Sequence, residues 1–410
     1  MSKTSFDQLY QSEDAKVRFE HVSGEFEKLF KYPATRFFSA PGRTEICGNH
    51  TDHNRGRVVA AAVNLDVFAA VKPQTDGVIT IKSEGFPIDT VDTHNLDVHE
   101  SEKNTSASLI RGVCMGLKNR GYKVGGFTAY THSNVLKGSG LSSSAAFEVL
   151  IVTILSHLYN DGKVSDIEAA QISQYAENVY FGKPSGLMDQ MASSVGGVVG
   201  IDFEDLENPV VKALSLDLGK YGYSVCIVDT KGNHAHMTPE YAAVPAEMKA
   251  VAGMLGKEVL RELTIDDILN NLPSLRKTLG DRAVLRALHF FDENERVDEL
   301  VKAIEDGDFE KYLSVIKASG DSSYKFLQNV YASSVPTEQG VSLGLYMSEK
   351  LLAGKGATRV HGGGFAGTIQ AYVPDEMLES YREGIEKVFG EGSCYALKIR
   401  PVGGTEVLLG

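Results

Sequence analysis

Hydrophobic and polar positions follow two different periods along the first half of the chain. Between residues 6 and 31, apolar side chains such as Phe19, Val22 and Phe26 recur at helical spacing, which predicts one or two amphipathic helices. Short runs rich in β-branched and aromatic residues predict strands at Arg36–Ala40, Val58–Leu65, Val67–Val71, Val78–Ile81 and Gly126–Ser133. Further helices are expected at Ser106–Leu117, Ser142–Tyr159 and Ser165–Tyr180.

The second half repeats this mixture of periods. Strands are expected at Tyr223–Thr230, Gly367–Val373 and Tyr395–Val402, and helices at Pro239–Leu255, Asp281–Asp306, Phe309–Ser319, Val341–Leu352 and Pro374–Val388. Strands and helices do not alternate strictly, which favours an α+β fold over a doubly wound sheet. Since 410 residues exceed one ordinary core, we expect two domains, over residues 1–210 and 211–410.

Charge and composition narrow the class of protein. The formal net charge of −13 disfavours nucleic acid and anionic membranes as partners. The N-terminal residues are polar, and the apolar runs are too short to cross a bilayer. The four cysteines form no CxxC pair, which indicates free thiols and a reducing compartment. We therefore expect a cytoplasmic protein.

The stretch NVLKGSGLSSSAAFEV, residues 134–149, places two glycines directly before a predicted helix. Gly138 and Gly140 allow close backbone approach to a ligand, and the first turn of a helix offers free N–H groups to phosphate. A serine-capped helix after a tight turn is the alternative. The segment matches neither GxxxxGK[ST] nor GxGxxG, so any nucleotide site here belongs to another kinase architecture.

A dense polar cluster occupies SAPGRTEICGNHTDHNRG, residues 39–56. We expect a loop that lines a site, because Asn, Asp and His donate to and accept from sugar hydroxyls. Arg43 can hold a phosphoryl group or a carboxylate with its planar fork. Metal ligation by His50, Asp52 and His53, or a simple solvated turn, are the alternatives.

Two carboxylates follow in QYAENVYFGKPSGLMDQMASSVGG. Glu177 lies near the end of a predicted helix, and Asp189 comes after a break at Pro184 and Gly186. Because the neighbours of Asp189 are small or apolar, the carboxylate needs a partner such as Arg43 or phosphate-bound magnesium. An N-cap role for Asp189 is the alternative.

Together these segments resemble the GHMP kinases, and specifically the galactokinase family. The family motifs PGRxNLIGEHTDYNxG, PLGxGLSSSAxLEV and GARMTGAGFGGCxIALV stand here as PGRTEICGNHTDHNRG, VLKGSGLSSSAAFEV and GATRVHGGGFAGTIQAYV, and GxPxGxMDQ stands as GKPSGLMDQ. The resemblance covers most of the chain and implies a two-domain fold with the active site in the cleft between the domains.

The resemblance also implies roles for individual residues. Asp189 corresponds to the catalytic aspartate beside the anomeric C1 hydroxyl of the sugar, and Arg43 to its partner. It implies ATP and Mg²⁺ as cofactors, a sugar as substrate and a monomeric state. Sugar contacts are expected from Glu45, Asn49, His50, Thr51, Asp52 and Tyr241, phosphate contacts from Gly138, Ser139, Gly140, Leu141, Ser142, Ser143 and Ser144, magnesium ligation from Ser144 and Glu177, and closure of the cleft from Gly362–Gly367.

The chain departs from the family pattern at the sugar end. Asn49 replaces the glutamate that accepts a bond from the C6 hydroxyl, and Glu45 replaces the usual asparagine. Galactose is the expected substrate. A C6-altered sugar such as galacturonate is the alternative, because Asn49 removes a charge that would repel a C6 carboxylate. A regulator that binds sugar without phosphorylating it is the third possibility, although Arg43, Ser144, Glu177 and Asp189 are all present.

Overall fold

Two β-sheets organise the molecule in its computed structural model, which describes residues 1–10, 12–135, 140–232 and 237–409. The larger sheet runs β1-β13-β2-β3-β6-β4-β5, with β7 paired to β3 and β8 to β7. Its strands are β1 (Ser2–Ser5), β2 (Arg36–Cys47), β3 (Arg57–Pro73), β4 (Val78–Ser83), β5 (Ile88–Asp92), β6 (Phe127–Ser133), β7 (Val198–Asp202), β8 (Val210–Leu214) and β13 (Thr405–Leu408).

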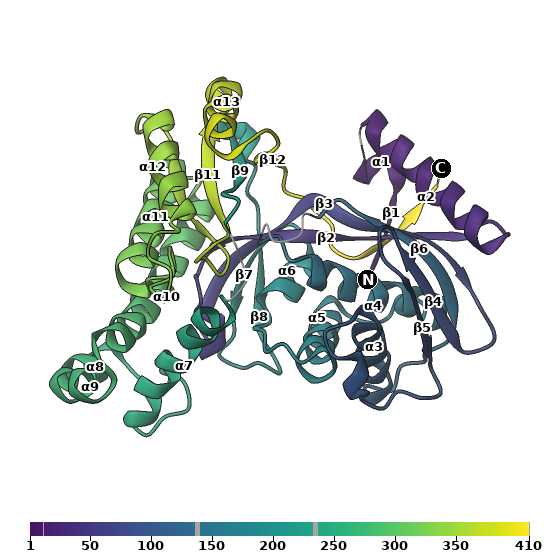
Figure 1. Cartoon of the computed structure of the whole chain (residues 1–410), viewed down its shortest axis with the longest axis horizontal. Helices are drawn as coiled ribbons and strands as arrows, with labels where there is room; N and C mark the ends of the chain where they lie inside the picture. The colour runs from purple at the N-terminus through teal and green to yellow at the C-terminus, as the bar shows by residue number, and fades with distance from the viewer. Residues whose placement is uncertain (11, 136–139, 233–236, 410) are drawn as a thin grey trace.

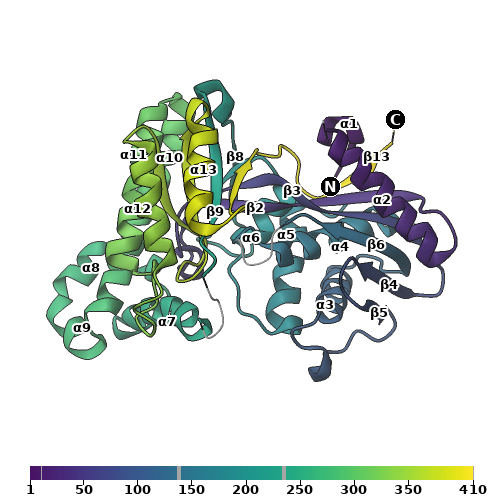
Figure 2. The same ribbon diagram turned by 45° about the horizontal axis from the view of Figure 1, so that its top comes forward.

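Helices cover both faces of this sheet (Figures 1 and 2). On one face lies α2, whose Val22 and Phe26 pack with Phe37 and Phe68 of the sheet. The helices of the other face bury a larger core with β2 and β3. The helices and short helical turns of this half are α1 (Phe6–Leu9), α2 (Glu13–Phe30), η1 (Asp52–Asn54), η2 (Glu100–Glu102), α3 (Ser106–Asn119), α4 (Ser143–Tyr159), α5 (Asp166–Tyr175), η3 (Ala176–Phe181) and α6 (Met188–Val195).

The smaller sheet is antiparallel throughout, in the order β10-β11-β9-β12. Its strands are β9 (Tyr223–Asp229), β10 (Ala357–His361), β11 (Thr368–Pro374) and β12 (Cys394–Leu397). The helical elements around it are η4 (Leu218–Tyr221), α7 (Thr238–Met254), η5 (Leu260–Glu262), α8 (Ile265–Asn270), α9 (Leu272–Leu279), α10 (Asp281–Asp306), α11 (Phe309–Ser322), η6 (Ser323–Leu327), α12 (Gly340–Leu352), η7 (Asp375–Met377) and α13 (Leu378–Phe389). Helices and strands are mixed in both halves, as the α+β prediction requires.

The strand β2 corrects the expectation of one loop over residues 39–56. It continues through Pro41 and Gly42 to Cys47 and pairs with β3, with irregular register between Pro41 and Arg43 and again between Glu45 and Cys47. Bulges of this kind admit proline and re-aim side chains. The loop is therefore confined to the residues between β2 and β3. Similarly, the two strands expected around Asp66 form the single strand β3.

Residues 2–5 and 405–408 pair at one edge of the larger sheet. β13 lies between β1 and β2, pairing parallel with the first and antiparallel with the second. Nearby, the fully buried carboxylate of Asp66 forms two ion pairs. Its Oδ1 lies 2.6 Å from Nη1 of Arg18 in α2, and its Oδ2 lies 2.8 Å from Nη1 of Arg400. Residues 405–408 thus join the sheet of the first half, while the division at residue 210 stays a prediction.

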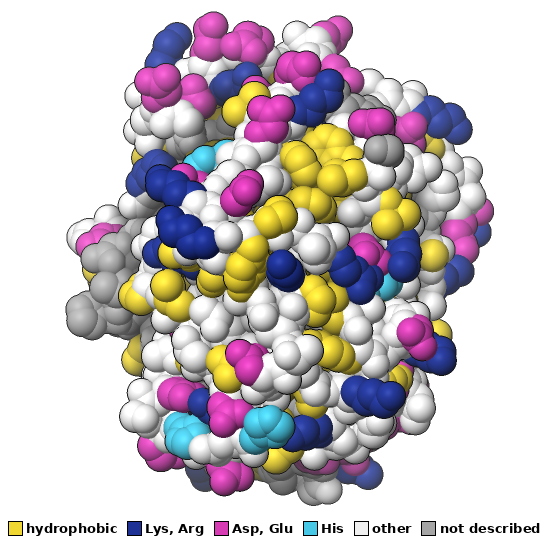
Figure 3. Space-filling view, turned by 90° about the vertical axis from the view of Figure 1, so that its right-hand side faces the viewer, with side chains coloured by type: hydrophobic (Ala, Val, Ile, Leu, Met, Phe, Trp, Pro, Cys, Tyr) yellow, Lys and Arg dark blue, Asp and Glu magenta, His cyan; other side chains and the backbone are white. Residues whose placement is uncertain are grey.

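None of the helices in the described ranges has the length and apolar character needed to cross a bilayer. On the face shown in Figure 3, acidic and basic side chains are interspersed with small hydrophobic patches. The net charge of −13 is therefore not gathered into one acidic block on this face.

Candidate active site

An arginine–aspartate pair joins β2 to α6. Nε and Nη2 of Arg43 lie 2.7 Å from Oδ1 and Oδ2 of Asp189, respectively, which is the bidentate geometry that the guanidinium fork favours. Arg43 is buried, whereas the side chain of Asp189 is 28% exposed. Leu187 occupies the N-cap of α6 and Asp189 lies in its first turn, so the N-cap alternative is wrong.

The electrostatic surroundings keep Asp189 ionised. Burial alone would raise its pKa, but the charge and hydrogen bonds of Arg43 and a bond from Ser142 together hold the pKa below its ordinary value. A carboxylate of this kind is a weak base and a good acceptor, so it can orient a hydroxyl group that donates to it.

The N-terminus of α4 lies against the same arginine. The Arg43 backbone N–H donates to the Leu141 carbonyl at 3.0 Å, and its Nη1 donates to the Gly140 carbonyl. Ser142 holds the N-cap position with a positive φ of 56° and makes no side-chain capping bond. The serine-tipped helix, Arg43 and Asp189 therefore converge. Ser143 and Ser144 form its first turn; Gly138 and Ser139 lie outside the described residues.

Two oxygen-bearing side chains suited to a hard cation lie together here, Ser144 in the first turn of α4 and Glu177 in η3. The Ser144 hydroxyl donates to Oε1 of Glu177 at 3.1 Å, and the Lys183 ammonium lies 2.9 Å from the same oxygen. Magnesium commonly binds one or two protein oxygens and completes its shell with water and phosphate. This donor set fits that pattern. The described residues contain no group of three or more His, Cys, Asp or Glu suited to a metal.

Three of the expected sugar contacts are buried in the protein. Asn49 is fully buried: Nδ2 donates to Glu45 and to the Gly362 carbonyl, each at 2.9 Å, and Oδ1 accepts from Asn329 at 2.8 Å. Glu45 in turn forms a 2.6 Å ion pair with the fully buried Arg359. The Thr51 hydroxyl lies 2.9 Å from the Gly48 carbonyl and 2.6 Å from the Arg57 carbonyl, and so closes the loop.

The other expected sugar residues lie closer to the surface, beside two glycine-containing segments. His50 Nε2 is 3.2 Å from the Gly363 carbonyl, and burial lowers the pKa of His50 to about 3, so the ring is neutral at physiological pH. Tyr241 of α7 donates to the Gly364 carbonyl at 3.0 Å. The Asp52 carboxylate approaches Gly186 so closely that a β-carbon there would lie 1.7 Å from Oδ2.

Sequence reasoning did not assign roles to several residues of this region. Lys183 lies in the GKPSGLMDQ segment, where a positive charge close to Glu177 and Asp189 in the sequence could have indicated a partner for one of these carboxylates. The buried pairing of Arg359 with Glu45 could not be predicted from the sequence, because the two residues lie more than 300 positions apart.

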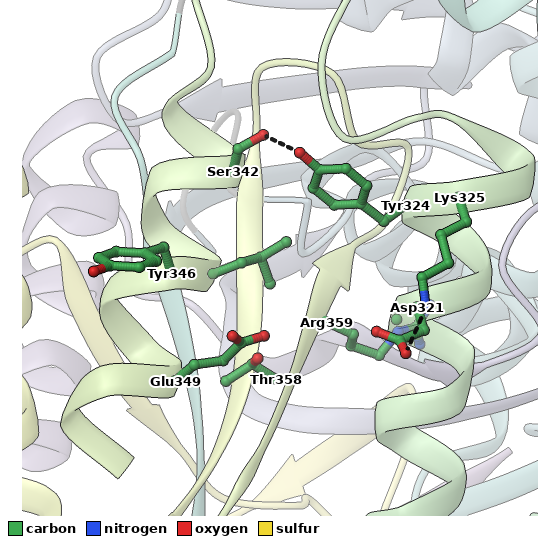
Figure 4. A pocket seen from close by; sticks show the side chains of 10 residues that line it. Asp321, Tyr324, Lys325, Ser342, Tyr346, Glu349, Thr358 and Arg359 are labelled. Carbon is green, nitrogen blue, oxygen red and sulfur yellow. Dashed lines mark hydrogen bonds and ion pairs between the residues drawn. The ribbon is translucent and has the colours of Figure 1, made fainter. Parts of the chain in front are cut away.

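A cavity of about 240 Å³ lies elsewhere, between α11, α12 and β10 (Figure 4). Tyr324, Tyr346 and Glu349 line it, and Lys325 forms a 3.0 Å ion pair with Asp321 beside it. Neither Arg43 nor Asp189 belongs to its lining. It is thus separate from the candidate active site, although Arg359 contributes to its wall.

Comparisons with known proteins identify the class to which this fold and site belong. Residues 24–73 match the galactokinase galactose-binding signature, and residues 108–197 match the N-terminal domain of GHMP kinases. The crystal structure of Lactococcus lactis galactokinase complexed with galactose superimposes with a TM-score of 0.80 at 24% identity, covering 94% of this chain and 99% of that one. A mevalonate kinase structure gives a TM-score of 0.63 at 13% identity, covering 89% of this chain and 99% of that one. The fold is that of the GHMP kinases.

Curated sequences then narrow the class to one family. Galactokinase of Streptomyces coelicolor is 30% identical over 383 residues, which cover 92% of this chain and 95% of that protein. Galactokinase of Limosilactobacillus reuteri is 30% identical over 384 residues, with 90% and 94% covered. The chain belongs to the galactokinase family and is an ATP-using sugar kinase.

Proposed function

We propose that this chain transfers the γ-phosphoryl group of ATP to the anomeric C1 hydroxyl of galactose, with Mg²⁺ as the divalent cation. The observation that carries the proposal is the Arg43–Asp189 pair at the N-terminus of α4. Phosphoryl transfer depends chiefly on in-line placement and on neutralising charge, and this cluster offers both functions. We also propose that the chain acts as a monomer in the cytoplasm.

Each group in the cluster has a distinct task. The ionised Asp189 accepts the hydrogen bond of the attacking hydroxyl and holds its oxygen toward the phosphorus. Because its pKa is depressed, Asp189 takes the proton late, as the new O–P bond forms. Arg43 offsets charge on the transferred phosphoryl, and N–H groups at the start of α4 bind phosphate oxygens. Ser144 and Glu177 would hold Mg²⁺, which when bound neutralises phosphate charge.

At the sugar end we assign direct contacts to His50, Asp52 and Tyr241. The remaining three expected sugar residues are buried: Glu45, Asn49 and Thr51. We propose that they act indirectly, because their hydrogen bonds hold the loop between β2 and β3 that carries His50 and Asp52.

One observation favours a second substrate. The carboxylate that the family carries at position 49 stands at position 45 here, where Arg359 neutralises it. A substrate with a C6 carboxylate would therefore meet less repulsion near Asn49 than in the family pattern. Galacturonate is the second candidate.

The test is ADP release by the purified chain with galactose, galacturonate, N-acetylgalactosamine or glucose. We expect turnover with galactose and a loss of about 10²–10⁴-fold in kcat for Asp189→Ala, with an unchanged melting temperature. Turnover with galacturonate alone would reassign the substrate. No ADP release with any sugar would favour the non-catalytic sensor, and near-normal turnover of Asp189→Ala would overturn the site.

A further inference from the structure

Two fully buried polar side chains contact each other next to the residues proposed to hold Mg²⁺. Glu148 comes from α4 and Gln190 from α6, directly after Asp189, and both side chains are 0% exposed. Gln190 Nε2 donates to Oε2 of Glu148 at 3.2 Å and to Oε2 of Glu177 at 2.8 Å. One amide nitrogen therefore links a buried carboxyl group to the carboxylate assigned to Mg²⁺.

We propose that Glu148 is a positioning residue of this site, which holds the Gln190 amide so that it fixes the Glu177 carboxylate for the divalent cation. The inference rests on the proposed function, because the cation role of Glu177 belongs to it. Its chemistry is a carboxyl–carboxamide pair between Glu148 and Gln190. Only Gln190 extends from that pair to Glu177.

Each member of the pair has one oxygen atom that bears on the protonation state of Glu148. Glu148 Oε1 and Gln190 Oε1 are both buried, and neither has a hydrogen-bond partner among the described residues. Two acceptor oxygens cannot bond each other, but an un-ionised Glu148 provides the hydrogen that both lack. In this form the carboxyl group offers a donor to the amide, while the amide N–H donates to Oε2 of Glu148.

The charge balance points the same way. Burial first, and then the nearby Glu177 carboxylate, raise the pKa of Glu148 well above its usual range. A neutral Glu148 does not repel the Glu177 carboxylate beside it. Oε2 of Glu177 is then held by Gln190, while Oε1 faces Ser144 and Lys183. Gln190 thus fixes Oε2 of Glu177, and Oε1 is directed toward the proposed cation site.

The experiment measures Mn²⁺ binding to the full chain in the presence of ADP, by titration calorimetry, without any sugar. Glu148→Ala and Gln190→Met remove the support, and each is expected to weaken Mn²⁺ affinity by on the order of 10-fold. Glu148→Gln keeps a neutral group of the same shape that donates and accepts, so it is expected to restore affinity close to that of the wild type. Thr153→Ser, a buried change on the same helix, is the matched control and should leave affinity unchanged.

Two outcomes would overturn the proposal: Glu148→Gln binding Mn²⁺ as weakly as Glu148→Ala, or Gln190→Met binding as well as the wild type. If Glu148→Ala does not fold, these two variants decide the question without it. The proposed function fails separately, since a wild-type chain that binds Mn²⁺ and ADP but phosphorylates no sugar would contradict that function and leave this inference intact.

Discussion

Arg43 uses its guanidinium and its backbone for different neighbours. Two nitrogens hold Asp189, while Nη1 and the backbone N–H reach the carbonyls that precede α4. Arg43→Lys keeps the charge but loses the planar fork, so the carboxylate and the phosphate segment are no longer held together. We expect kcat to fall by about 10²–10³-fold, measured as ADP release at saturating sugar and ATP. A kcat near the wild-type value would show that charge alone is sufficient.

At the same scale, Gly186 controls where Asp52 can lie. A β-carbon at position 186 would meet Oδ2 of Asp52 at 1.7 Å, and the far end of that side chain can move more easily than the backbone. Gly186→Ala should therefore displace Asp52 and raise the KM for sugar by about 10-fold or more, because one positioned hydrogen bond is lost, with little change in the melting temperature. An unchanged KM would remove Asp52 from the sugar contacts.

The site residues differ in how far sequence could predict them. Arg43 and Asp189 could be paired in advance, because a carboxylate among small and apolar neighbours needs a cation. Glu148 could not, since it interrupts an apolar helix much as a surface residue would, and only the packing of α6 against α4 shows that it is buried.

At the scale of elements, helix ends were predicted best where glycine marks them. α10 spans Asp281–Asp306 as expected, between Gly280 and Gly307, both with positive φ. β2 was predicted too short because the dense polar residues after Ala40 indicated a loop, whereas the strand continues through Pro41 and Gly42 with bulges. Local signals thus determined the helix, while pairing with β3 determined the strand.

The helix α2 offers a prediction about stability. Gly24 lies exposed in its interior, has no positive φ, and a β-carbon there would meet nothing within 4 Å. Gly24→Ala should therefore raise the free energy of unfolding by about 0.5–1 kcal/mol, because alanine loses less backbone entropy in a helix. Urea denaturation measures this change, and a destabilised variant would mean that α2 is not helical at this position.

At the scale of the whole molecule, Asp66 joins three distant parts of the chain. Burial would raise its pKa, but Arg18 and Arg400 lower it to about 2, against 3.8 ordinarily. The unfolded chain therefore takes up the proton first, and the ion pairs contribute about 2 kcal/mol of stability above pH ~4, which is lost as the pH falls toward ~2.

Urea denaturation of Asp66→Asn across this pH range tests the contribution. At neutral pH we expect a loss of about 3–5 kcal/mol, because the buried Arg400 and the partly buried Arg18 lose their partner, and a flatter dependence on acid. Asp298→Asn is the control: its ion pair with Arg57 is 60% exposed on the aspartate side, so a change of at most about 1 kcal/mol is expected. Equal losses in the two variants would contradict the assignment.

The position of β13 also constrains the order in which the chain can be assembled during translation. The strand β1 pairs with β13, which is synthesised much later, and is separated by it from β2. Residues 2–5 therefore have no docking place in the sheet until residues 405–408 have left the ribosome. The other strands of the first half can pair while synthesis continues, but the edge formed by β13 and β1 is completed last. In a nascent chain stalled before β13, residues 2–5 would therefore remain unpaired.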